Sequence, residues 1–310
     1  MRTMDGSVER AFRVMGCGSH VVIHGGDEDL LDVAEARLRE LESWWSRFRD
    51  DSDITLANRS AGTPVVVHPD TLAVVSRALD AWRQTDGRFD ITVLPALLDV
   101  GYTHSAVDHA AAPTVPGTRV GMSAWVKVDY NASTLTVPAA SAIDLGGIGK
   151  GFAADIVAEE LVEMGATGAV VNIGGDLRAT GNPSDDASWY LGIEDPTVAP
   201  TKPPTHLTAV RLHEGGVATS GTTVRTFTTP DGRTTHHLID PLSGRPAEHE
   251  LLTATVLAAD AATAEAFATA AMMLPAGKAV AMLDRLGLAG LVVGTDGTVH
   301  RTATMKDFEP

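Results

Sequence analysis

The chain has 310 residues and a formal net charge of −16, with 40 acidic side chains against 24 lysines and arginines. This balance argues against a general nucleic-acid binder, because phosphate contacts require clustered basic side chains. A hydrophobic content of 44% is ample for a sizeable core, and the single cysteine, Cys17, excludes an internal disulfide.

The N-terminal part of the chain shows little pattern. We expect residues 1–14 to be a loose segment, followed by a single domain over residues 15–310. The residues just before Cys17 resemble a lipoprotein cleavage site, but charged residues at positions 9, 10 and 13 interrupt the apolar run that such a site requires. Without a signal peptide or an apolar run of transmembrane length, the sequence predicts a cytoplasmic protein with no membrane anchor.

The first half of the chain alternates helical and extended patterns. An apolar stripe at helical spacing predicts a helix over residues 27–48. A capped turn of helix follows at 52–58, and a second long helix is predicted over 69–84, with Asp70 and Thr71 as candidate caps. Residues 103–122 are rich in Ala, Pro, Thr and Gly and are expected to form an irregular loop before a hairpin over 125–137.

Residues 142–155 carry the most informative pattern. They indicate a short buried strand, a glycine loop with one carboxylate and one lysine, and the start of a helix. Glycines allow close approach of the backbone to a ligand, and a helix N-terminus favours an anion, so a phosphate-bearing ligand is the first hypothesis. A P-loop fails at two positions. A dinucleotide fingerprint fits Gly149, Gly151 and Ala154, but a tight turn without a ligand explains this lone match about equally well.

The second half adds strands and two alanine-rich helices. Strands are predicted near 169–173, 189–194, 207–212, 235–239 and 252–258, helices near 261–273 and 276–286, and a final hairpin over 291–301. Strands and helices do not alternate strictly. The pattern therefore favours an α+β fold with mixed, largely antiparallel sheets and flanking helices over a doubly wound sheet, and it counts against a nicotinamide dehydrogenase.

The first alanine-rich helix contains a polar pair. Glu265 and Thr269 are four residues apart and share one helix face, among neighbours that are nearly all apolar. A buried carboxylate and hydroxyl need partners, and a hard cation such as Mg²⁺ would supply one. The pair alone is more often explained by a glutamate at the rim of the core and a threonine bonded to its own helix.

Two adjacent histidines form another polar group. Because neighbouring residues of a strand point to opposite faces, at most one of His236 and His237 faces a given site. One inward histidine beside Asp240 is a candidate acid or base. A surface histidine next to a turn-forming Asp-Pro pair explains the pattern about equally well.

In order along the chain, these segments resemble the ApbE family of FAD:protein FMN transferases. Each motif alone is weak, but eight in the family's order are specific. The motifs are Met-Gly at 15–16, Phe48 followed by Asp51-Ser52, Gly-x-Phe-Asp-x-Thr-Val at 87–93, Asp-Leu-Gly-Gly-Ile-Gly-Lys-Gly at 144–151, Asn-x-Gly-Gly-Asp at 172–176, Ala-Thr-Ser-Gly at 218–221, His-x-Ile-Asp-Pro at 237–241, and the helix around 264–270.

The resemblance implies Mg²⁺-dependent transfer of the FMN part of FAD to a Ser or Thr hydroxyl of an acceptor protein, with release of AMP. It also implies the positions that serve this reaction. Those that would contact FAD are Met15, Phe48, Arg88, Phe89, Asp90, Asp144, Lys150 and Leu238. Mg²⁺ would be held by the backbone oxygen of Gly147 with Glu265 and Thr269, and His237 would be the base.

The chain departs from the family pattern at several positions. Relatives usually carry aspartate where this chain has Glu265, some carry a further acid where it has Ala268, and Cys17 replaces a common threonine. Two other functions therefore stay open: a Mg²⁺-dependent FAD pyrophosphatase, in which water replaces the protein hydroxyl, and a non-catalytic FAD-binding protein.

Overall fold

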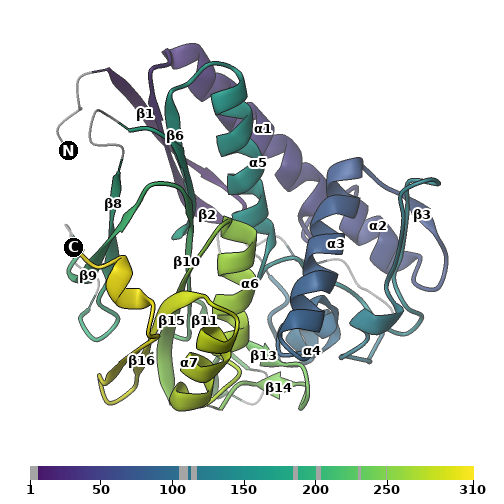
Figure 1. Cartoon of the computed structure of the whole chain (residues 1–310). Helices are drawn as coiled ribbons and strands as arrows, with labels where there is room; N and C mark the ends of the chain where they lie inside the picture. The colour runs from purple at the N-terminus through teal and green to yellow at the C-terminus, as the bar shows by residue number, and fades with distance from the viewer. Residues whose placement is uncertain are drawn as a thin grey trace. The chain divides into compact units, whose positions relative to one another are not determined.

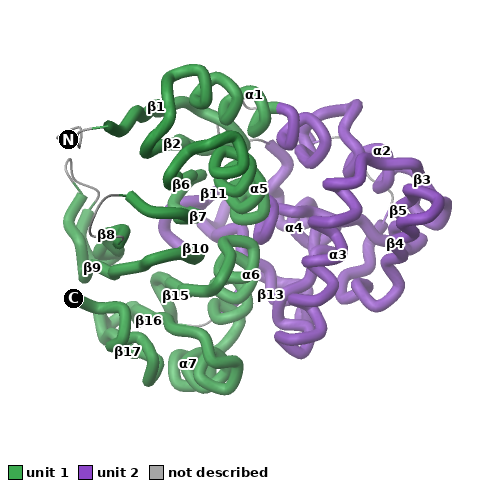
Figure 2. Tube along the Cα trace, turned by 45° about the horizontal axis from the view of Figure 1, so that its top comes forward, with its two compact units in different colours: residues 1–39, 150–221, 249–310 green, residues 40–149, 222–248 purple. Residues whose placement is uncertain are grey.

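Figure 1 shows the computed structural model, which describes residues 6–104, 111–112, 117–183, 188–199, 204–229, 232–248 and 250–310. The chain divides into two units (Figure 2): residues 1–39, 150–221 and 249–310 form unit 1, and residues 40–149 and 222–248 form unit 2. The single domain expected over residues 15–310 stays a prediction.

Unit 1 is built on an eight-stranded sheet in which all the recorded pairings are antiparallel. Its order is β1-β2-β6-β7-β10-β15-β16-β17. The strands are β1 (Ser7–Val14), β2 (Cys17–His24), β6 (Gly168–Ile173), β7 (Asp176–Gly181), β10 (Gly215–Gly221), β15 (Leu251–Ala258), β16 (Ala289–Gly294) and β17 (Val299–Arg301). The predicted α+β class with largely antiparallel sheets is confirmed.

The two faces of this sheet are covered differently. A hairpin of β8 (Trp189–Glu194) and β9 (His206–Leu212) packs its apolar residues onto one face, against side chains such as Val217 and Leu257. Helix α6 (Ala261–Ala271) packs on β10 and β15, and α7 (Ala276–Arg285) packs on β16; a short 3₁₀ helix, η3 (Met305–Asp307), comes last. Ser220 of β10 contacts α6, and because Val217 lies an odd number of residues away, the helices cover the opposite face (Figure 1).

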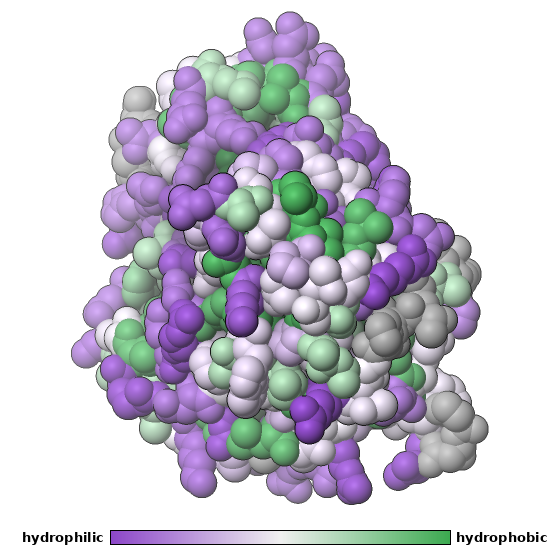
Figure 3. All heavy atoms as spheres, turned by 90° about the vertical axis from the view of Figure 1, so that its right-hand side faces the viewer, coloured by the Kyte–Doolittle hydropathy of each residue, from purple (hydrophilic) through white to green (hydrophobic). Residues whose placement is uncertain are grey.

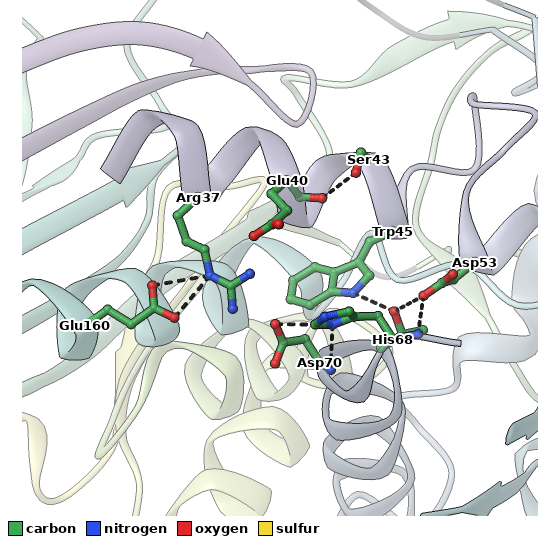
Figure 4. A network of polar contacts seen from close by, with 9 residues as sticks. Arg37, Glu40, Ser43, Trp45, Asp53, His68, Asp70 and Glu160 are labelled. Atoms are coloured by element: carbon green, nitrogen blue, oxygen red, sulfur yellow. Dashed lines mark hydrogen bonds and ion pairs between the residues drawn. The ribbon is translucent and has the colours of Figure 1, made fainter. Parts of the chain in front are cut away.

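Two long helices connect the units along the chain. Helix α1 (Glu28–Trp45) begins in unit 1 and ends in unit 2, and α5 (Gly149–Glu163) begins at the last residue of unit 2 and continues in unit 1. Within unit 1, Nε of Arg37 on α1 donates to both carboxylate oxygens of Glu160 on α5, at 3.1 and 3.2 Å (Figure 4). This contact ties the two helices together.

Unit 2 combines short helices with small sheets. Its helices are α2 (Asp53–Arg59), α3 (Pro69–Gln84) and α4 (Leu94–Asp99), with 3₁₀ helices η1 (Ile91–Val93) and η2 (Ser123–Trp125). Strands β3 (Val65–Val66), β5 (Thr134–Thr136) and β4 (Lys127–Asp129) form one sheet; β11 (Thr226–Thr228) pairs with β12 (Thr234–His236), and β13 (Ile239–Asp240) with β14 (Arg245–Pro246).

A polar network fixes the entry to α3 in unit 2. The indole N–H of Trp45 donates to Thr71 Oγ1 at 3.2 Å, and that hydroxyl donates to Asp53 at 2.6 Å (Figure 4). Nδ1 of His68 accepts the N–H of Asp70 and caps the helix. The cap predicted at Asp70 or Thr71 is therefore wrong, because Thr71 is committed to Asp53.

The structure corrects the sequence analysis in the sheet of unit 1. From Ser7 onward the expected loose segment is strand β1, which pairs with β2 along its whole length. Its less exposed positions include Arg10, whose guanidinium pairs with Asp32, and this charge hides the alternation of apolar residues. Strands β7 and β10 were also not predicted.

Two further corrections concern unit 2. The start of the segment 142–155 does not form the expected strand; instead the side-chain amide of Asn58 donates to Ile143 O at 2.9 Å and accepts its N–H at 2.8 Å. The strand expected over 235–239 is two short strands, β12 and β13, with His237 between them. Part of the loop expected over 103–122 lies outside the described residues.

The surface mixes hydrophilic and apolar residues. The face in Figure 3 carries many hydrophilic side chains with apolar ones in small groups between them. Singly exposed apolar residues such as Val66 and Val224 are normal on folded proteins. Over the described parts of the chain, none of the helices combines the length and the apolar character needed to span a bilayer.

Candidate active site

The starts of α5 and α6 lie against each other in unit 1. A Cβ added to Gly151 would lie 2.3 Å from the carbonyl oxygen of Ala261, and one added to Gly216 would lie 2.3 Å from its nitrogen. No side chain fits at either position, so the two glycines let α6 begin close to α5 and β10. Asp155 completes this junction, because its carboxylate accepts the N–H groups of Ala261 and Ala262 at 2.8 and 2.9 Å.

The junction places Glu265 over the first turn of α5. Its side chain is 2% exposed, and Oε2 accepts the N–H of Gly151 at 2.7 Å. Oε1 forms an ion pair with the ammonium of Lys150. The same ammonium lies 2.8 Å from Oδ2 of Asp176, the first residue of β7, whose side chain is 5% exposed. Two predicted residues, Lys150 and Glu265, are therefore in direct contact.

The electrostatics of this group favour a further positive charge. Two buried carboxylates share one ammonium, which leaves a net charge of −1 when both are ionised. Burial raises the pKa of Glu265 to about 7, against the lowering effect of Lys150. Burial likewise raises the pKa of Asp155 to about 7. A buried carboxylate of this kind gains from an added cation.

The residues on this face of α6 fit a hard cation. Thr269 lies one turn after Glu265, and its hydroxyl is 3.1 Å from Oγ of Ser220 on β10 rather than on its own helix. Carboxylate, hydroxyl and backbone oxygens are the ligands that Mg²⁺ prefers. Within the described ranges, no three His, Cys, Asp or Glu side chains gather as a metal site, so this set would be completed by other oxygens. Gly147, the third predicted ligand, is half-buried in the turn before α5, in unit 2.

Met15 occupies a strained turn at the end of unit 1's first hairpin. Met15 and Gly16 both have positive φ, 51° and 68°, between the paired residues Val14 and Cys17. A non-glycine residue in this region is uncommon and points to a constraint on the turn. Cys17 faces Gly174, where an added Cβ would lie 2.8 Å from the sulfur and 4.0 Å from Cδ of Lys150.

In unit 2, Asp144 is held by a buried arginine. Nε of Arg47 lies 2.7 Å from Oδ2 of Asp144, and both side chains are largely buried. The guanidinium also lies over the rings of Phe48 and Tyr102, at 4.1 and 5.1 Å from their centroids. One face of Phe48 is thus already covered. Nη1 of Arg47 is buried without a hydrogen-bond partner, which leaves a donor for a ligand oxygen.

Asp90 offers a hydrogen-bond acceptor in the same unit. Its Oδ1 accepts the N–H of Thr92 at 2.7 Å and the hydroxyl of Ser123 at 2.8 Å, whereas Oδ2 is buried without a partner. Burial raises the pKa of Asp90, and these hydrogen bonds oppose the rise. Of the two predicted neighbours, Phe89 is 3% exposed and belongs to the core, and Arg88 is half-buried.

The two histidines have different surroundings. The ring of His236 is engaged on both sides: Nδ1 accepts the N–H of Leu238 at 3.3 Å, and Nε2 lies 3.1 Å from the carbonyl of Ala247. Burial lowers the pKa of His236, so it stays neutral to lower pH. His237 is half-buried with its ring 6.3 Å from that of Tyr102, and Leu238 is 5% exposed. His236 is therefore a structural residue.

Sequence reasoning missed several polar residues that support these positions. Asp176 ends the motif at 172–176 and Arg47 directly precedes Phe48, but nothing in the sequence showed that they pair with Lys150 and Asp144. Asp155 gave a detectable signal, because a carboxylate that follows glycines and alanines at the start of an apolar helix needs a backbone partner.

Comparison with known proteins adds an independent observation. The model of the ApbE family matches residues 15–292. The FAD:protein FMN transferase of Haemophilus influenzae is 30% identical over 301 residues, covering 92% of this chain and 86% of that protein. The enzyme of the same name from Treponema pallidum is 31% identical over 302 residues, covering 92% and 81%.

Solved structures agree with the sequence relatives. The ApbE protein of Thermotoga maritima superposes with a TM-score of 0.85 at 26% identity, covering 98% of this chain and 99% of that one. The flavinyl transferase ApbE of Pseudomonas stutzeri gives a TM-score of 0.79 at 26% identity, covering 99% and 98%. The predicted resemblance and the predicted transferase class are both confirmed: the chain belongs to the ApbE family.

Proposed function

We propose that this chain transfers the FMN moiety of FAD to a Ser or Thr hydroxyl of an acceptor protein, with Mg²⁺, and releases AMP. The observation that carries the proposal is the buried group of Glu265, Asp176 and Lys150 beside Thr269. Glu265 and Thr269 supply oxygen ligands for a hard cation, and the ammonium of Lys150, paired with Asp176, is suited to a phosphate oxygen. The sequence relatives are FAD:protein FMN transferases, which supports the transfer of FMN from FAD to a protein.

Each unit contributes a separate set of residues to the proposal. In unit 1, Glu265 and Thr269 would supply side-chain oxygens to Mg²⁺, and Lys150 would donate to the diphosphate. Met15 contacts the nucleotide. In unit 2, the backbone oxygen of Gly147 stays the predicted third ligand. In unit 2, the proposed FAD contacts are Phe48, Arg88, Phe89, Asp90, Asp144 and Leu238. The open acceptor on Asp90 and the open donor on Arg47 support a polar ligand there.

The chemistry is a displacement at phosphorus. The acceptor hydroxyl oxygen bonds to the FMN phosphorus, the bond from that phosphorus to the bridging oxygen breaks, and AMP leaves with this oxygen. The hydroxyl proton passes to His237, because His236 is bonded to the backbone on both sides. Bound Mg²⁺ supplies charge neutralisation on the diphosphate oxygens, and Lys150 adds a hydrogen bond to the developing charge.

One incubation tests this function against its alternatives. The purified chain is mixed with FAD, Mg²⁺ and a separately purified candidate acceptor protein, and the mass of the acceptor is then measured by mass spectrometry. An added FMN mass together with free AMP supports transfer. Free FMN and AMP without labelling support a pyrophosphatase, and intact bound FAD supports a binding protein. Either of the last two results contradicts the proposal.

A further inference from the structure

Asp176 is a buried carboxylate to which the proposed reaction gives no role of its own. It begins β7, directly after Gly174 and Gly175, both of which have positive φ. Its Oδ2 lies 2.8 Å from the ammonium of Lys150, and its Oδ1 accepts the N–H of Thr219 at 3.3 Å. The carboxylate is thus fixed on the sheet, with one oxygen directed at Lys150.

The ammonium of Lys150 occupies Oε1 of Glu265, the carboxylate oxygen that a divalent cation would bind. Oε1 of Glu265 is paired with Lys150, and Oε2 takes the N–H of Gly151. Two cations on one buried carboxylate oxygen repel each other strongly, because the surroundings screen them weakly. A cation that binds Oε1 must therefore displace the ammonium, whose other described carboxylate partner is Asp176.

We propose that Asp176 is a positioning residue that retains the ammonium of Lys150 when a divalent cation takes Glu265. The inference rests on the proposed function, because it assumes that Glu265 binds the cation. Because Asp176 holds it, the ammonium of Lys150 can leave Glu265 and still keep a buried carboxylate partner. The ammonium then stays beside the cation, where it can donate to a phosphate oxygen. Without Asp176, the ammonium loses one of its two described carboxylate partners and stays more firmly on Glu265, so the cation competes less well.

Two other roles for Asp176 are distinguishable from this one. As a direct cation ligand, Asp176 would favour the cation whether or not Lys150 is present. As a structural bond to Thr219, it would affect folding and leave the cation affinity unchanged. The proposed role alone makes the effect of Asp176 depend on Lys150, which a double-mutant cycle detects.

The experiment titrates Mn²⁺, as a calorimetric probe for Mg²⁺, into four proteins without FAD at about pH 8, where Glu265 is largely ionised. The proteins are the parent, Asp176→Asn, Lys150→Met and the double variant. Asparagine keeps an oxygen for the N–H of Thr219, and a circular dichroism melt checks that each protein is folded.

The proposal expects Asp176→Asn to weaken Mn²⁺ binding about tenfold or more in the parent and less than about twofold in the Lys150→Met background. Equal weakening in both backgrounds, or none in the parent, overturns it while leaving the metal site intact. No binding by the parent overturns the metal site itself, and the inference with it. Should Asp176→Asn not fold, Lys150→Met decides: it should bind Mn²⁺ about tenfold more tightly than the parent, and unchanged or weaker binding overturns the proposal.

Discussion

Gly151 is the position at which a single methyl group most directly tests how Glu265 is held. In Gly151→Ala, the new Cβ would lie 2.3 Å from the oxygen of Ala261, 2.5 Å from its carbonyl carbon and 2.9 Å from the nitrogen of Ala262. Non-bonded heavy atoms pack at about 3.5 Å. The starts of α5 and α6 must therefore separate by about 1 Å, which pulls Glu265 away from the N–H of Gly151.

The expected loss of stability follows from three contributions. Overpacking against backbone costs about 1–3 kcal/mol. Weakening the charged hydrogen bond between Glu265 and Gly151 costs up to about 1.5–3 kcal/mol. The greater helix propensity of alanine returns about 1 kcal/mol. We expect the free energy of unfolding to fall by about 1.5–5 kcal/mol, measured by urea denaturation with tryptophan fluorescence.

Gly149→Ala is the matched control, two residues earlier in the same helix. There the new Cβ would meet Leu145 at 3.5 Å and Trp45 at 3.9 Å, which are ordinary contacts. Its stability should stay within about 1 kcal/mol of the parent. Calorimetry should also show Mn²⁺ binding weakened by about tenfold or more in Gly151→Ala only. Equal behaviour of the two variants would refute the idea that close helix packing positions Glu265.

The remaining predictions concern the proposed ligands, the base and pH. The double variant Glu265→Ala, Thr269→Ala should lose metal-dependent FAD cleavage, followed as AMP release by chromatography; full activity would remove the proposed metal role. His237→Ala should slow transfer more than it weakens FAD binding; equal loss of transfer and binding in this variant would make His237 structural. His236→Ala should mainly lower the thermal midpoint of unfolding. Because burial raises the pKa of Glu265 from 4.5 to about 7, the folded protein holds a proton that the unfolded chain releases between these values. Stability should therefore rise, and Mn²⁺ affinity fall, as pH decreases through this window; Glu265→Gln should reduce both slopes in melts and titrations, with Asp155 providing a remaining slope of stability.

The helices were the part of the fold most accessible from sequence. The predicted helix over 69–84 coincides with α3, and α1 and α6 lie within their predicted ranges. These segments carry long periodic patterns or clear ends, which local rules detect. β10 was missed because it consists of glycines and small residues and lacks the bulky apolar residues that indicate a strand; one of its glycines, Gly216, allows the close approach of α6.

In the candidate site, too, the features within one segment were predictable from sequence and the contacts between distant segments were not. That Glu265 and Thr269 share a face followed from helix geometry alone. The contact of Glu265 with Lys150 joins residues 115 positions apart, and that of Asn58 with Ile143 joins residues 85 positions apart. No periodicity within one segment encodes such distant pairs, so only the folded chain, or a family resemblance, identifies them.

The strand order of the sheet in unit 1 constrains when the sheet can form while the chain is being synthesised. β10 pairs with β15, which begins only at Leu251, after the chain has passed through the second segment of unit 2. Until the ribosome has passed Ala258, β10 lacks its partner strand β15, and α6 is made only after that, from Ala261 onward. Exposed edges invite association with other strands. A product truncated before Leu251 would lack Glu265 and would keep an unpaired edge on β10, so we expect it to be inactive and prone to aggregate.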